Sequence, residues 1–382
     1  MRLRAPSVGE DVRVLNRWIP FSFWPTFQNT RREGLQWTLF SSDPWFLIES
    51  RIRKLSEPVR SEAIAYLLQA RDFYRAARDS NINAAKPLLS YYAFLNLSKC
   101  FVVWKSGNSL GPRVDHGLTE KLPTTAGAIY GELLVNRNQD ATSAFAKLSE
   151  ALGDVLPVVG QNMTNNMVSI RSQDLLSQVL IGHRVWCSGE QINEKFVSLQ
   201  DVRYRHDPDR RMMWLRVRVY KDDLSRFKFS QNSVAKALSH DANRTFYPVI
   251  CTALGDDKRE LVEFELETKV DYKNRPSETL MLLSKKIRKQ LWRSVTTHEP
   301  YRKYYIYIPT ATQARLSQIQ SLYLASYYFG SITRYKPQSF TAILESSIGP
   351  FVQEFFTNQQ AQILYLMASE FANQEVTRGA TV

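Results

Sequence analysis

The sequence lacks the patterns that mark several large classes of protein. Its 382 residues hold only three cysteines, which lie far apart at Cys100, Cys187 and Cys251. An odd number at this spacing argues against a disulfide framework and fits reduced thiols in a reducing compartment. No apolar run approaches about 18 residues, so no membrane span is expected. The basic first residues have no apolar stretch of the kind found in a secretory signal. We therefore expect a cytoplasmic protein without membrane association.

Motifs for nucleotide, metal and serine chemistry are also missing. The chain contains neither GxxxxGK[ST] nor GxGxxG, so nothing marks a nucleotide-binding loop. It contains no HExxH and no CxxC, which argues against a zinc enzyme. A GxSxG nucleophile elbow is absent as well. We expect no metal site and no cofactor.

Positive charge is what the sequence has in excess. Fifty lysines and arginines stand against 37 acidic residues, giving a formal net charge of +13 and an isoelectric point of about 9.6. A basic protein favours acidic partners, with nucleic acid first and an acidic protein or anionic surface second. The alternative is that the charge serves solubility on scattered basic faces.

Apolar spacing predicts the secondary structure. Three-to-four periodicity predicts helices at about 58–79 and 84–104, and the second is apolar almost all round, so it should be central and buried. Alternating patterns predict strands at 212–220, 245–252, 261–270 and 303–308. The fold class is therefore α+β, mostly α-helical, with a helical bundle and an inserted small antiparallel β-sheet.

Changes in composition divide the chain into five parts. The first is rich in aromatic residues and in prolines that disfavour a helix interior, so we interpret it as an extended arm packed over a core. An exposed aromatic platform for bases is the alternative. The predicted parts are an arm at 1–40, a helical region at 41–196, an α+β region with the sheet at 197–310, C-terminal helices that pack back on the bundle at 311–374, and a tail at 375–382.

Three segments in order resemble the YaaC-like protein family of bacteria. They are AKPLLSYYAFLNLSK at 85–99, DHGL at 115–118, and SITRYKP at 331–337 after a tyrosine-rich helix. The resemblance covers most of the chain. That family has no assigned reaction, so the resemblance implies a fold and a set of interesting positions without a mechanism. These positions are Lys99, His116, Gly117, Arg334 and Tyr335.

The helix pair at 58–104 also looks like the core of HEPN-type proteins, small helical bundles of which many are RNases of toxin and phage-defence systems. Their Arg-x4–6-His signature has one match here, Arg293 to His298. An arginine can stabilise phosphorane charge, and a histidine can move a proton near neutral pH. The alternative is a helix C-terminus with favourable basic residues, far in sequence from the helix pair.

The loop after the buried helix holds the stronger catalytic candidate. His116 follows Asp115, which could orient its ring, and loops held by a rigid scaffold often carry sites. An Asp-His-Gly turn is the alternative. Lys99, late in the buried helix, could share a pocket with His116 or hold an anion, or it could snorkel to the surface. Arg334 completes this catalytic set, with Arg293 and His298 as the alternative pair.

A second set of candidates would bind nucleic acid or another anion. Phosphate contact is the functional interpretation. A solvated face, or cations attracted to a helix C-terminus, is the alternative. The residues are Arg216, Arg218, Lys285, Lys286, Arg288, Lys289, Tyr335 and Lys336.

Three functional hypotheses remain. The first is a nucleic-acid-associated protein, with RNA favoured by the HEPN-like pattern. The second is a HEPN-like nuclease or hydrolase of a toxin or phage-defence type. The third is a non-catalytic scaffold or accessory subunit that binds an acidic protein partner. The sequence does not decide between RNA and DNA, whether the protein is an enzyme, or whether it forms a homo-oligomer.

Overall fold

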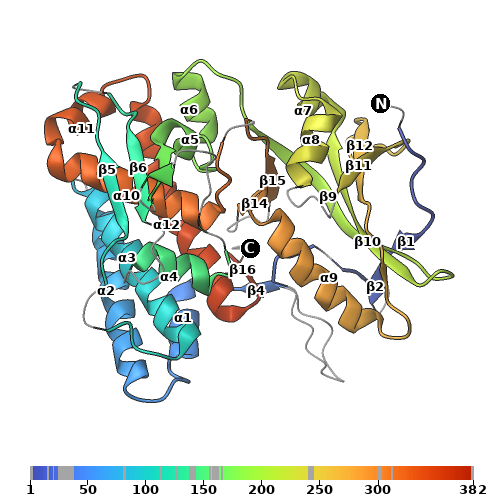
Figure 1. The fold of residues 1–382 in the computed structure, drawn as a ribbon, viewed down its shortest axis with the longest axis horizontal. Coiled ribbons are helices and arrows are strands. Elements are labelled where there is room, and N and C mark those ends of the chain that lie inside the picture. The colour runs from blue at the N-terminus through green and yellow to red at the C-terminus, as the bar shows by residue number, and fades with distance from the viewer. Residues whose placement is uncertain are drawn as a thin grey trace. The chain divides into compact units, whose positions relative to one another are not determined.

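A computed structural model describes residues 3–14, 17–19, 21–24, 38–80, 83–111, 114–125, 128–136, 143–154, 156, 163–164, 167–239, 245–298, 303–310 and 313–379. The chain forms two compact units (Figure 1). The sheet unit comprises residues 1–40, 194–309 and 373–382, and the helical unit comprises residues 41–193 and 310–372. The predicted α+β class with a majority of helix is confirmed.

The helical unit is built around a hairpin of two long helices. These are α2 (Val59–Asp79) and α3 (Lys86–Ser106), and both match the helices predicted from periodicity. Helix α3 buries side chains on all sides, and it packs against α2, α10 (Gln318–Tyr335), α4 (Ala144–Ala151) and α12 (Gly349–Ala372). The sequence is apolar around this helix because no face of it meets water along most of its length.

Apart from α10 and α12, the remaining helices of this unit are short. They are α1 (Pro44–Ile52), α5 (Ser172–Leu176), α6 (His183–Gly189) and α11 (Pro337–Leu344). Helix α10 begins at a capping box in which Ser317 and Gln320 bond each other's backbone N–H groups. None of the described helices has the length and apolar character needed to cross a bilayer.

A four-stranded antiparallel sheet also belongs to the helical unit, where the sequence predicts none. Its order is β5 (Leu118–Lys121), β6 (Glu132–Asn136), β8 (Met167–Arg171) and β7 (Met163–Thr164). The strands are short, and single sequence windows of this length carry little periodic signal.

The sheet unit contains the predicted antiparallel sheet. Its strand order is β11 (Phe246–Val249), β12 (Leu261–Leu266), β10 (Met212–Tyr220), β9 (Phe196–Asp207), β15 (Lys303–Tyr307) and β14 (Val295–His298). Two short strands lie off this path: β1 (Glu10–Asp11) pairs with β9, and β13 (Val270–Asp271) pairs with β10. The further strands β2 (Arg13–Val14) and β3 (Arg17–Trp18) form a small hairpin.

Helices cover the apolar face of this sheet. Helix α9 (Pro276–Leu291) lies along the β9–β10 hairpin, where the Tyr204 hydroxyl is 2.8 Å from Ser284 Oγ (Figure 1). It also meets α8 (Gln231–Leu238), because Gln290 donates to the carbonyl of Leu238. The short α7 (Lys221–Arg226) follows β10 directly.

Aromatic residues of the N-terminal arm are buried in the sheet unit. Phe21, Phe23 and Trp24 are all below 5% exposed, and they make edge contacts with Trp292 and Tyr304. The predicted arm also includes residues 25–37, which lie outside the described residues.

The structure corrects the predicted tail at 375–382. Residues Glu375–Thr377 form strand β16, which pairs in parallel with β4 (Thr38–Phe40). All three residues of β16 are buried, and the Tyr304 hydroxyl donates to Glu375 Oε1 at 2.7 Å. The strand is ordered because its backbone is paired, a feature that its short polar sequence does not reveal.

Candidate functional site

The loop that carries His116 is clamped between α3 and α4. Asp115 forms a parallel bridge with Ser143, and the Ala144 amide donates to the Asp115 carbonyl at 2.9 Å. Gly117 has φ +70°, and a Cβ atom there would lie 1.7 Å from Ser143 Oγ. Only glycine fits this position, so the sequence Asp-His-Gly fixes the place of the imidazole relative to the N-terminus of α4.

Tyr91 of α3 holds the imidazole. Its hydroxyl lies 2.5 Å from His116 Nδ1. Burial, followed by the neighbouring Tyr323 hydroxyl, raises the pKa of Tyr91 far above its usual range, so the phenol stays protonated. The bond allows two ring tautomers. In one, Nδ1–H donates to the phenol oxygen and Nε2 is a free base. In the other, the phenol donates to Nδ1 and Nε2–H can donate to an anion.

The charges around His116 keep it neutral. Its half-burial lowers its pKa, the positive charges of Lys99 and Arg334 lower it further, and Asp115 and Glu120 act in the opposite direction. An imidazole with a pKa below its ordinary 6.5 is uncharged at pH 7. It is therefore available as a base or as a neutral hydrogen-bond partner.

Tyr91 and Tyr327 contact the imidazole, with the Tyr327 ring 5.9 Å from that of His116, and Tyr323 packs against Tyr91. The ring of Tyr91 lies 5.5 Å from that of His116, 5.9 Å from that of Tyr323 and 5.3 Å from that of Tyr327. Tyr327 donates to Glu120 and to the carbonyl of Leu118. These contacts join α3, α10 and β5 around one histidine, which is the arrangement of a rigidly held site.

Lys99 and Arg334 lie near His116 but have other contacts of their own. The Lys99 ammonium lies 5.7 Å from the Tyr66 ring centroid, and burial lowers the pKa of this lysine. Arg334 is exposed at the end of α10, with its guanidinium over the ring of Tyr335 at 5.1 Å. Of the three predicted catalytic residues, Lys99 and Arg334 therefore both act on His116 through their positive charge.

The alternative catalytic pair lies in the sheet unit. Arg293 follows the end of α9, and His298 ends β14 opposite Lys303. Burial and the charge of Lys303 lower the pKa of His298. The helix pair that resembles HEPN-type proteins belongs to the helical unit, so the motif and the pair fall in different parts of the chain.

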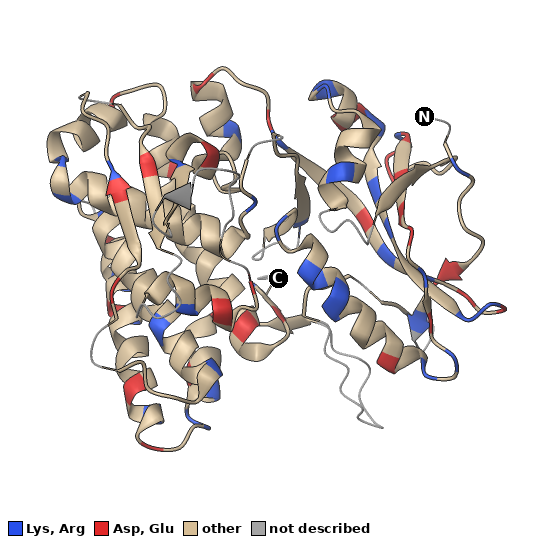
Figure 2. Cartoon of the chain, in the orientation of Figure 1, with Lys and Arg blue, Asp and Glu red and all other residues tan. Residues whose placement is uncertain are grey.

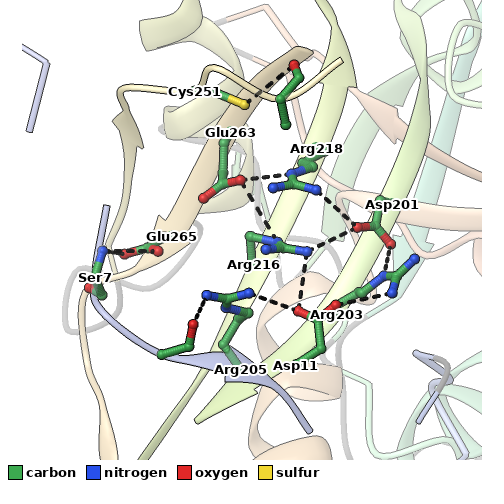
Figure 3. A network of polar contacts seen from close by, with 12 residues as sticks. Ser7, Asp11, Asp201, Arg203, Arg205, Arg216, Arg218, Cys251, Glu263 and Glu265 are labelled. Atoms are coloured by element: carbon green, nitrogen blue, oxygen red, sulfur yellow. Dashed lines mark hydrogen bonds and ion pairs between the residues drawn. The ribbon is translucent and has the colours of Figure 1, made fainter. Parts of the chain in front are cut away.

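The strand arginines of the predicted anion-binding set are paired with carboxylates (Figure 3). Arg216 is 5% exposed and lies 3.3 Å from both Asp11 and Asp201. Arg218 donates to Glu263 at 2.7 Å. The register explains the pairing of Arg218, which stands opposite Glu263 of β12 on one side and Asp201 of β9 on the other. A nucleic-acid phosphate would have to displace these carboxylates.

Helix α9 presents the basic face that the sequence predicts. Lys285, Lys286 and Lys289 are exposed, and Figure 2 shows basic residues in blue along this helix. Among the residues that the structure describes, no carboxylate lies within ion-pair distance of Lys285 or Lys289. Arg288 instead turns inward, with its guanidinium 4.2 Å from the ring centroid of Trp292 and 5.2 Å from that of Trp24.

The last two candidates follow Arg334. Tyr335 is 59% exposed, and Lys336 donates to the Pro123 carbonyl at 2.7 Å. The Lys336 ammonium therefore joins the end of α10 to the loop after β5, which is a structural role.

The sequence missed three residues of the His116 site: Tyr91, Tyr327 and Glu120. Tyr91 lies in the helix predicted to be buried, and it is buried, but its hydroxyl contacts His116, 25 positions later. A buried tyrosine hydroxyl needs a hydrogen-bond partner, and this requirement is the sequence signal that could have identified Tyr91 as part of the site.

Comparison with known proteins agrees with the family resemblance of the three sequence segments. A family model described as YaaC-like Protein matches residues 28–371. The chain belongs to the YaaC-like family. The match spans the helical unit and most of the sheet unit, including α3, the His116 loop and the end of α10. No curated protein and no solved structure matches the chain.

Proposed function

We propose that this YaaC-like protein associates with nucleic acid, RNA before DNA, through the exposed lysines of α9. The observation that carries the proposal is the pair Lys285 and Lys289, one helical turn apart, exposed, and without a carboxylate partner in the described chain. Cations that are not neutralised within the protein attract phosphates, and the net charge of +13 acts in the same direction.

The contact is with the sugar–phosphate backbone. Trp24 and Trp292 are buried and pack against Arg288, so they offer no ring face to a base. Lysine ammonium groups bind phosphate as point charges without reading sequence. The preference for RNA rests only on the sequence pattern of the helix pair, and the comparison of RNA with DNA tests it.

Salt dependence tests this proposal. We would measure binding of fluorescent single-stranded RNA and DNA of equal length by anisotropy, from low to moderate salt. Lys285→Gln/Lys289→Gln should weaken binding and reduce the slope of log K against log salt by about 1.4, since each phosphate contact on a single strand contributes about 0.7.

The matched control is Lys54→Gln/Lys121→Gln, which removes two exposed lysines from the helical unit and the same total charge. It should keep the slope. Equal weakening by both double variants would show that net charge alone drives binding, and no binding at low salt would refute the proposal.

A second candidate function is hydrolysis of a phosphodiester at His116. It is favoured by the hydrogen bond between Tyr91 and a neutral imidazole, with Lys99 and Arg334 close enough to influence its charge. In this role Nε2 takes a proton from the attacking water as its oxygen bonds to phosphorus, and the imidazolium returns that proton to the ester oxygen that leaves. The Tyr91 oxygen accepts Nδ1–H, and the cations stabilise the charge on the phosphoryl oxygens.

The test compares RNA cleavage by wild type, His116→Ala and His298→Ala. Loss of cleavage in His116→Ala with retention in His298→Ala is the expected result. The reverse outcome would move the chemistry to Arg293 and His298, and cleavage unchanged in both variants would exclude each histidine as the acid–base group.

A further inference from the structure

The N-terminal segment crosses the polar face of the sheet unit as a strap, residues 4–11. Arg4 bridges Val249 of β11, and the Ile250 amide donates to the Arg4 carbonyl at 2.9 Å. The Ser7 amide then faces the carboxylate of Glu265 on β12, at 3.1 and 3.3 Å. Asp11 finally pairs with Arg205 of β9. Since β12 and β10 lie between β11 and β9, the strap passes over four strands.

The face beneath the strap is lined with charged side chains. Arg216 of β10 stands opposite Arg203 of β9, and Arg218 stands opposite Asp201. Directly opposed side chains of antiparallel strands share a face, and like charges there repel. The pairing of Arg216 with Arg203 therefore requires negative charge from elsewhere.

Asp201 supplies part of that charge, at 2.6 Å from Arg203 and 3.3 Å from Arg216, and the strap supplies more through one residue. Asp11 lies 3.0 Å from Arg203, 3.0 Å from Arg205 and 3.3 Å from Arg216 (Figure 3). Burial acts to raise the pKa of Asp11, but the Arg205 hydrogen bond and the charges of Arg216 and Arg203 hold it below its usual range. Without Asp11, four arginines would face only Asp201, Glu263 and Glu265.

Donors on these arginines also remain unused. The Nε atoms of Arg205 and Arg216 are buried and have no hydrogen-bond partner among the described residues. Arg216 is almost fully enclosed, and its Nε lies 3.8 Å from the nearest carboxylate, Glu263. A tetrahedral phosphate has more acceptor oxygens than a carboxylate, and planar guanidinium forks suit it.

We propose that Arg203, Arg205 and Arg216 form a binding site for a phosphate group, in which the Asp11 carboxylate stands in for the ligand until the strap is displaced. The proposal is independent of the lysines on α9. It assigns to the strap the role of an internal competitor, whose removal leaves one positive charge in excess among these arginines and the carboxylates of Asp201, Glu263 and Glu265.

The strap is held by contacts that can be exchanged. Its backbone pairing with β9 is short, covering Glu10, Asp11 and the Val12 amide that donates to the Tyr204 carbonyl at 2.9 Å, and the Arg4–Glu267 ion pair is about half exposed on both sides. Exposed ion pairs of this kind contribute little to stability. The most enclosed ion pairs of the strap are those of Asp11, the group that a phosphate would replace.

Two variants of the full chain release the strap in different ways. Asp11→Ala removes the competing carboxylate. Gly9→Ala keeps every charge, but its Cβ would lie 2.5 Å from the His206 carbonyl oxygen and from a ring atom of Trp214. This steric clash should displace the strap from the sheet. Thermal unfolding would be followed with inorganic phosphate as the probe, against sodium chloride at matched ionic strength.

Asp11→Ala should unfold at a lower temperature than wild type in chloride and regain stability in phosphate with saturation. Its half-saturating phosphate concentration should be about tenfold or more below that of wild type. In wild type only the fraction of molecules with a displaced strap can bind phosphate, and the apparent affinity for phosphate is reduced by that fraction. Gly9→Ala should shift in the same direction. Arg205→Gln in the Asp11→Ala background should abolish the response.

Equal phosphate responses in wild type, Asp11→Ala and Gly9→Ala would overturn the proposal, as would a response that survives Arg205→Gln. If Asp11→Ala fails to fold, two other measurements test the proposal. They are the phosphate response of Gly9→Ala and the rate of trypsin cleavage after Arg4 and Arg13 in wild type. Phosphate should accelerate that cleavage by exposing the strap, and unchanged or slower cleavage would refute displacement. Lys285→Gln/Lys289→Gln should keep the phosphate response, so this test can fail or succeed separately from the RNA-binding test.

Discussion

The Tyr91 hydroxyl and the His116 imidazole, 25 residues apart in the chain, meet at 2.5 Å within the helical unit. This contact joins the buried helix α3 to the loop that follows it. It also explains why a polar ring beside an exposed aspartate has a single fixed orientation. Four predictions follow from this site and from the charged face of the sheet unit.

Tyr91→Phe should remove the hydrogen bond and leave the packing of the ring unchanged. Loss of one buried hydrogen bond lowers the free energy of unfolding by about 1 kcal/mol. Tyr92→Phe is the matched control, since Tyr92 lies next in the same helix and is half-buried, and its effect should stay within about 0.5 kcal/mol. Urea denaturation measures both, and equal effects would show that the bond adds nothing to stability.

Lys99→Gln should raise the pKa of His116. The lysine charge disfavours the imidazolium, so its removal makes protonation easier. An NMR titration of the histidine Cε1–H signals would give the midpoint, and Arg334→Gln should move it in the same direction. Lys105→Gln, at the exposed end of the same helix, is the control. A midpoint that is unmoved in both Lys99→Gln and Arg334→Gln would separate those residues from the site.

The stability of the protein should fall as the pH drops from 7 to 5, in part because of His116 and His298. Both have pKa values lowered by burial, so the unfolded chain binds protons more readily than the folded one. Their contribution is therefore complete above the ordinary value of about 6.5 and is lost as the pH falls through the folded value. Unfolding of His116→Gln/His298→Gln should depend less on pH over this interval. A profile parallel to that of wild type would contradict the lowered values.

Arg216→Met should destabilise the sheet unit strongly. It removes a buried cation that pairs with Asp11 and Asp201, and breaking a buried ion pair from one side costs about 3–5 kcal/mol. Arg4→Gln breaks the exposed pair with Glu267 and should cost less than about 1 kcal/mol. Chemical denaturation followed by tryptophan fluorescence compares the two, and similar losses would mean that the network is solvated.

Long periodic segments were predictable from the sequence because their signal accumulates over many residues. Helix α3 and strand β10 lie where the patterns place them. The four-stranded sheet β5–β8 was missed because its strands have five residues or fewer, too short for alternation to stand out. Strand β16 was taken as part of a tail for the same reason, and its pairing with β4 depends on residues more than 300 positions away.

The charged residues were harder to place than the apolar ones. Sequence spacing correctly puts Arg216 and Arg218 on one face of a strand, but it does not show that Asp11, Asp201 and Glu263 reach the same face. Asp11 is 194 residues from Arg205, and the register alone joins them. Lys285 and Lys289 keep the role predicted for them as a hypothesis, because the exposed face of α9 meets no such partners in the described chain.

The parallel pairing of β4 with β16 has a consequence for biosynthesis. Residues 38–40 leave the ribosome more than 300 residues before their strand partner at 375–377. The helical unit has the same property, since α3 packs against α10 and α12. The emerging chain therefore exposes the apolar surface of α3 until α10 and α12 have been made.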